Sequence, residues 1–83
     1  MTYKIYFKKS VGRDLKKISK EQVERILLKI EETLLKNPER YPSLSGKFAG
    51  LRKFRVGDYR IIFTILDDTV LILRVSHRKE SYR

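Results

Sequence analysis

The sequence LRKFRVGDYRIIFTIL, residues 51–66, decides the fold. Within it, two segments of alternating apolar and polar residues flank the pair Gly57-Asp58. Alternation with a period of two predicts β-strands, and a two-residue loop that contains glycine is typical of a tight hairpin. We therefore expect an antiparallel hairpin with strands at residues 51–56 and 59–66.

The length of this turn also predicts which residues face each other. A two-residue loop places Arg55 opposite Arg60 and Phe54 opposite Ile61. The core face of the hairpin is then expected to carry four apolar side chains, those of Phe54, Ile61, Phe63 and Ile65. The opposite face is expected to carry cations, starting with Lys53, Arg55 and Arg60.

A third strand is predicted at residues 70–76, because the apolar alternation resumes there after a turn. We expect a three-residue loop at residues 67–69, since an odd length keeps the core face continuous. Three alternate side chains would then face the core, namely Leu71, Leu73 and Val75. Arg74 would join the cations on the opposite face.

Upstream of the hairpin, the sequence predicts one more strand and then two helices, in which apolar residues recur with a period of 3.6. Tyr3, Ile5 and Phe7 alternate as in a first strand, and Ser10 is a plausible N-cap for a short helix. Ser19 and Gln22 fit a capping box that opens a second helix, which Asn37-Pro38 ends. The apolar face of that second helix consists of Val23, Ile26, Leu27, Ile30 and Leu34.

These elements predict one α+β domain over residues 1–83, in the order β-α-α-β-β-β. A helical hairpin packs on one face of a small, mainly antiparallel sheet. At this chain length, a single domain with a thin core is the expectation.

The composition is strongly basic. The chain has 20 Lys and Arg against 10 Asp and Glu, a formal net charge of +10, and the excess is shared evenly between its two halves. A polyanion is therefore the expected partner. Without Cys and with one His, the sequence predicts no disulfide, no thiolate nucleophile and no transition-metal site. Since no apolar run reaches the length of a membrane span and no signal peptide is recognisable, we expect a cytoplasmic protein.

The cations of the hairpin allow two interpretations. Arg55 and Arg60 lie directly opposite each other, and like charges in that position destabilise a sheet. In one interpretation, the long side chains extend into water and screening makes the pair nearly neutral. In the other, Lys53, Arg55, Arg60 and Arg74 form an anion site whose geometry suits a phosphate.

The C-terminal residues add groups that can transfer protons. RNA cleavage needs a base for the 2′-hydroxyl, an acid for the 5′-oxygen and cations for the phosphorane. His77 could supply either proton transfer, and Tyr82 or Lys53 the other. The cations that could hold the phosphorane are Arg55, Arg60 and Arg78.

Residues 51–63 (LRKFRVGDYRIIF) and 75–83 (VSHRKESYR) together resemble the RelE/ParE superfamily of prokaryotic toxins. The resemblance implies a microbial-ribonuclease-like fold and, in the RelE branch, metal-independent cleavage of mRNA in the ribosomal A site. It matches Lys53 and Arg55 to the family's paired basic residues, and Arg60 to its central arginine. Arg78 and Tyr82 match the arginine and the tyrosine that follow the last strand, and His77 matches a histidine that some relatives have. The neighbouring cations are assigned to RNA binding, namely Arg52, Arg74, Lys79 and Arg83.

The resemblance also implies the partners. It predicts a cognate RelB-like antitoxin, acidic and partly disordered when free, together with the ribosome and its A-site mRNA, and no small-molecule cofactor. Two alternatives stay open, a ParE-like gyrase inhibitor without ribonuclease activity and a basic RNA-binding module without catalysis. The complete set of basic residues and the tyrosine favours the RelE branch.

Overall fold

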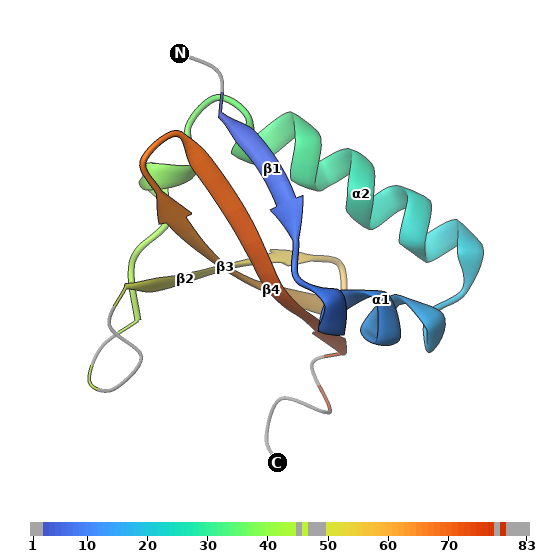
Figure 1. Cartoon of the computed structure of the whole chain (residues 1–83). Helices are drawn as coiled ribbons and strands as arrows, with labels where there is room; N and C mark the ends of the chain where they lie inside the picture. Colours follow the sequence, from blue (N-terminus) through green and yellow to red (C-terminus); the bar gives the residue numbers. More distant parts are fainter. Residues whose placement is uncertain (1–2, 45, 47–49, 78, 80–83) are drawn as a thin grey trace.

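Two helices and one four-stranded sheet make up the fold (Figure 1), which a computed structural model describes for residues 3–44, 46, 50–77 and 79. The elements are β1 (Lys4–Phe7), α1 (Lys9–Lys16), α2 (Lys20–Leu34), the 3₁₀ helix η1 (Pro38–Arg40), β2 (Leu51–Val56), β3 (Tyr59–Leu66) and β4 (Thr69–His77). The sheet has the order β1-β4-β3-β2, with β1 parallel to β4 and the other pairs antiparallel. The α+β fold predicted from the sequence is confirmed.

The hairpin of β2 and β3 begins, turns and ends at the predicted residues. Arg55 pairs with Arg60 and Phe54 with Ile61, so the predicted register is confirmed. Gly57 has φ 58°, a backbone conformation that glycine adopts without a steric penalty. The two-residue turn therefore sets the register of the hairpin.

The ends of the helices were predicted with mixed success. The Ser19 side chain caps α2 by accepting the N–H of Gln22 at 3.4 Å, as the capping motif indicated. The prediction that Ser10 caps α1 is wrong, since α1 begins at Lys9 and its N-cap is Lys8. The Val11 N–H donates to the Lys8 carbonyl at 2.9 Å, which starts the first turn before Ser10.

The core lies between the helices and one face of the sheet. In α2 the buried residues Ile26, Ile30 and Leu34 are spaced by four, which places them on one face of the helix. Phe63 is fully buried, and its ring packs edge-on against those of Phe54 and Tyr41. The other buried apolar residues are Val11, Pro38, Val56, Ile61, Val70, Ile72 and Val75.

The predicted core face of β4 is wrong at two of its three positions. Val70 and Ile72 are fully buried, whereas Leu71 and Leu73 are only partly buried. The cause is the turn, because Leu66 pairs with Thr69 and leaves a two-residue loop in place of the expected three. The even loop reverses which side chains of β4 face the core.

A β-bulge in β4 then shifts the alternation back. Phe63 pairs with Ile72 and Ile62 with Arg74, so that Leu73 is an extra residue without a partner in β3. Val75 consequently faces the core, as predicted, and is 2% exposed. Arg74 is turned to the opposite face of the sheet.

Candidate functional site

The face of the sheet opposite the helices carries a group of four cations, Lys53, Arg55, Arg60 and Arg74, which we call the basic face. One further cation on that side, Lys4, pairs with Thr69 beside the turn between β3 and β4. Lys53 on β2 pairs with Ile62, and Ile62 pairs in turn with Arg74 on β4. Arg55 pairs with Arg60 in the next row. The placement of these four residues on one face, as predicted from the sequence, is therefore confirmed by the register.

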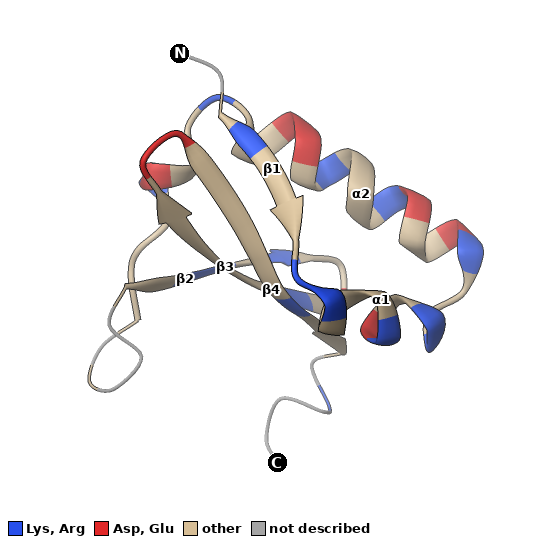
Figure 2. Cartoon of the chain, viewed as in Figure 1, with Lys and Arg blue, Asp and Glu red and all other residues tan. Residues whose placement is uncertain are grey.

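The geometry of the basic face suits a phosphodiester. Neighbouring strands lie about 4.8 Å apart, so the three-strand row from Lys53 to Arg74 spans roughly 10 Å at the backbone. Lys53, Arg55 and Arg74 are exposed and Arg60 is partly buried. The end of the sheet near α1 thus concentrates cations, whereas Asp67 and Asp68 occupy the turn between β3 and β4 at the other end (Figure 2).

Beside Arg60, the end of β4 places a hydroxyl that the sequence interpretation did not consider. Ser76 pairs with Arg60 across β3 and β4, and it is the one buried polar residue in the described part of the chain, at 8% exposure. It shares the basic face because paired residues project to the same side. The sequence signal for it is a polar residue at the position that alternates with Arg74 along the strand.

His77 does not lie on the basic face. It pairs with Tyr59, whose other partner, Val56, is buried under the helices. The rings of Tyr59 and His77 meet edge to face with centroids 5.3 Å apart, and both line a hollow of about 180 Å³ beside α1. The sheet therefore separates the imidazole from Arg55 and Arg60, with which the sequence interpretation grouped it.

The imidazole of His77 instead contacts the chain that leaves β4. Its Nδ1 accepts the backbone N–H of Lys79 at 3.2 Å. This arrangement requires an unprotonated Nδ1, because a protonated nitrogen cannot accept a hydrogen bond. Lys79 itself is exposed.

Arg52, assigned to RNA binding from the sequence, also lies on the helix side. It pairs with Phe63, whose side chain is in the core. Its Nη1 donates to the carbonyl of Glu39 at 3.1 Å and to the carbonyl of Tyr41. The guanidinium thus holds the segment around η1, and the alternation of β2 explains why Arg52 and Lys53 have different environments.

Three of the predicted site residues, Arg78, Tyr82 and Arg83, lie outside the described residues. Among those that the structure describes, Lys53, Arg55, Arg60 and Arg74 come together, whereas Arg52 and His77 lie across the sheet. No group of three or more His, Cys, Asp or Glu side chains is arranged to hold a metal ion in the described ranges. In the same part of the chain, no helix combines the length and the apolar composition needed to cross a membrane.

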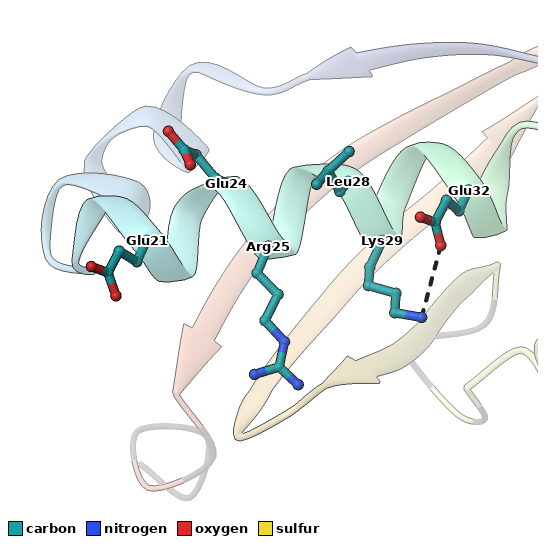
Figure 3. Close-up of a pocket in the computed structure, with 6 residues that line it drawn as sticks. All are labelled: Glu21, Glu24, Arg25, Leu28, Lys29 and Glu32. Carbon is teal, nitrogen blue, oxygen red and sulfur yellow. Dashed lines mark ion pairs between the residues drawn. The ribbon is translucent and has the colours of Figure 1, made fainter.

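A second hollow, of about 360 Å³, lies on the exposed face of α2 (Figure 3). Its lining mixes both charges around Leu28, which is 58% exposed, and Lys29 lies 3.8 Å from Glu32. The lining residues are Glu21, Glu24, Arg25, Leu28, Lys29 and Glu32. Since this surface belongs to the side of α2 that faces away from the core, it has no part in the basic face.

The whole chain has relatives among toxins. A family model described as the ParE toxin of type II toxin–antitoxin systems, parDE, matches residues 5–82. Toxin RelG of Mycobacterium tuberculosis is 37% identical, with 100% of this chain and 99% of that protein covered. Toxin RelE3 of Methanocaldococcus jannaschii is 35% identical, with 95% of this chain and 94% of that protein covered.

A solved structure agrees with these sequence relatives. The toxin–antitoxin complex RelBE2 of Mycobacterium tuberculosis contains a chain that superposes with a TM-score of 0.81 and 32% identity, covering 94% of this chain and 100% of that one. Fold, length and sequence therefore point to the same group of proteins. The chain belongs to the RelE/ParE family, the toxins of type II toxin–antitoxin systems.

Proposed function

We propose that this toxin is a ribosome-dependent endoribonuclease that cleaves mRNA in the ribosomal A site without a metal ion. The observation that carries the proposal is the basic face, where Lys53, Arg55 and Arg60 converge on one exposed surface of the sheet. The RelE and RelG names of the curated relatives support the RelE branch. Dependence on the ribosome rests on this likeness.

In the proposed reaction, the 2′-oxygen of one nucleotide attacks the adjacent phosphorus, and the bond from phosphorus to the 5′-oxygen breaks. A base removes the 2′-hydroxyl proton and an acid protonates the 5′-oxygen, which yields a 2′,3′-cyclic phosphate and a 5′-hydroxyl. Arg55, Arg60 and Arg78 stabilise the dianionic phosphorane by charge. Because His77 lies across the sheet from Arg55 and Arg60, we assign the two proton transfers to Lys53 and Tyr82.

The proposed protein partner is a RelB-like antitoxin that is acidic and partly disordered when free. The net charge of +10 favours an acidic partner, and the similar chain of RelBE2 belongs to a toxin–antitoxin complex. Co-expression with the neighbouring reading frame tests this partner. Recovery of a stable complex, and relief of growth arrest, are the expected results.

Inhibition of DNA gyrase is the second candidate function, because the matching family model carries the ParE name. A reconstituted translation extract with primer extension on the mRNA, run beside a gyrase supercoiling assay, separates the two. The proposed function predicts cut mRNA when ribosomes are present, little cutting by the toxin alone and unaffected supercoiling. Intact mRNA together with inhibited supercoiling would establish the gyrase alternative.

A further inference from the structure

Helix α1 places an acidic residue, Asp14, beside the edge of β4, and the proposed reaction leaves this residue unassigned. The pairing of β1 with β4 ends at Phe7 and Ile72, so within the described residues no strand lies beside the later part of β4 on this edge. Helix α1 occupies that place (Figure 1). From α1, the Oδ2 atom of Asp14 accepts the backbone N–H of Val75 at 3.0 Å. The carboxylate thereby satisfies an edge N–H that would otherwise lose its partner.

The same oxygen atom also faces Arg74. The Nε atom of Arg74 lies 3.8 Å from Oδ2 of Asp14. The Asp14 side chain is only 14% exposed, whereas that of Arg74 is 62% exposed. The Asp14 end of this ion pair is thus largely buried, and the Arg74 end is exposed to solvent.

The β-bulge explains why Arg74 faces outward at this point of β4. Val70 and Ile72 face the core, and regular alternation would turn Arg74 inward with them. The extra residue, Leu73, turns Arg74 outward instead, since bulges redirect the side chains that follow them. Asp14 binds the backbone directly after this irregular point, at Val75.

We propose that Asp14 is a positioning residue, which fixes the bulged end of β4 and aims Arg74 at an RNA phosphate on the basic face. This inference rests on the proposed function, since it supplies the ligand. Asp14 and Arg74 come from α1 and β4, 60 positions apart in the sequence, and they meet only in the folded chain. The acidic residue stands alone in a helix that otherwise carries Lys and Arg among its charged residues.

The direction in which RNA binding changes when the Asp14 carboxylate is removed separates a positioning role from a purely electrostatic one. A carboxylate beside the basic face lowers the local positive potential, so an electrostatic role alone predicts that its removal strengthens RNA binding. Positioning predicts the reverse, because an Arg74 side chain without its anchor loses its aim at the phosphate. The variant Asp14→Asn removes the charge and keeps a side-chain oxygen that can accept the Val75 N–H.

The test measures binding of a short single-stranded RNA whose nucleotides all carry 2′-O-methyl groups, because without a free 2′-hydroxyl the toxin cannot cut it. Fluorescence anisotropy over a range of salt concentrations gives the affinity and its salt slope. We expect Asp14→Asn and Arg74→Ala each to weaken binding by about 5- to 10-fold, the size of one typical hydrogen bond. Each should also reduce the salt slope by about 0.7, the value for one phosphate contact to a single strand.

The double variant Asp14→Asn/Arg74→Ala should bind no more weakly than Arg74→Ala alone, because Asp14 acts through Arg74. Asp67→Asn is the matched control, since it removes the same charge from the far turn and should not weaken binding. Thermal melts check that every variant is folded. If Asp14→Asn binds as well as or better than the wild type, or if the double variant shows additive losses, the inference is wrong.

The same experiment separates this inference from the proposed function. A wild-type toxin that neither binds this RNA nor cuts mRNA in the translation extract overturns both. A wild-type toxin that does both, with Asp14→Asn unchanged in affinity and salt slope, overturns the positioning role alone.

Discussion

Arg55 and Arg60 face each other across the hairpin of β2 and β3. In an antiparallel pair, their Cβ atoms lie about 4.5–5.5 Å apart, and like charges at that distance destabilise the sheet. The repulsion between the two cations is therefore a cost to the sheet. A site that binds a phosphate does gain, because two cations on adjacent strands reach the same anion.

Arg55→Ala should therefore stabilise the free toxin while it weakens RNA binding. We expect the melting temperature to rise by a few degrees, about 1–5 °C, because the exposed cross-strand repulsion is relieved. Screening should shrink this gain at high salt. Thermal melts at low and high salt check the expectation, and a lower melting temperature for the variant would assign Arg55 a structural role.

The stability of two variants tests which side chains of β4 face the core. Ile72→Ala should lower the free energy of unfolding by about 2–5 kcal/mol, because Ile72 is fully buried. Leu71→Ala should lower it much less, since Leu71 is only partly buried on the other face. Urea denaturation of both variants provides the comparison. Equal losses would contradict the two-residue turn between β3 and β4.

These two positions also show which parts of the fold the sequence could predict. The hairpin was predictable because the pair Gly57-Asp58 fits a two-residue turn and because the two faces of the hairpin differ in polarity. In β4 both faces are apolar, since Val70 and Ile72 alternate with Leu71 and Leu73, so the pattern does not distinguish the faces. The loop and the bulge each shift the alternation by one residue, and the prediction missed both.

The two missed shifts cancel after the bulge, which is why Arg74 was predicted on the correct face. The same alternation places His77 with Val75 on the helix side, although its position beside Arg78 in the sequence suggested the basic face. Asp14 was missed for a different reason. Its contact with Val75 joins residues that are distant in the chain, and no local pattern encodes such a contact.

His77→Asn should leave mRNA cleavage close to the wild-type rate. The imidazole lies on the helix side, and asparagine keeps an oxygen that can accept the Lys79 N–H in place of Nδ1. Cleavage rates between pH 5.5 and 8.5, for the wild type and the variant, are the measurement. Loss of cleavage, together with loss of the acid limb of the pH profile, would show that His77 transfers a proton.

Tyr3 should ionise at a higher pH than an unperturbed tyrosine. Its hydroxyl donates to a carboxylate oxygen of Glu39, which raises the pKa of Tyr3 above 10.0, with desolvation as a smaller cause. A raised folded-state pKa means that this contact stabilises the fold at neutral pH and is lost as the pH rises through the raised value. Absorbance titration should show that Glu39→Gln moves one of the five tyrosines to lower pH. Identical titration curves would contradict the contact.

The central claim, that the basic face cleaves mRNA, is tested most directly by primer extension in a reconstituted translation extract with the wild type, Arg60→Ala and Arg78→Ala. Removing one preorganised charge from the transition state should slow cleavage by about 100- to 1,000-fold in each variant, with the fold retained. Arg25→Ala is the matched control, because it removes a cation from the exposed face of α2 and should cleave like the wild type. Cleavage by Arg60→Ala at the rate of Arg25→Ala would contradict the claim.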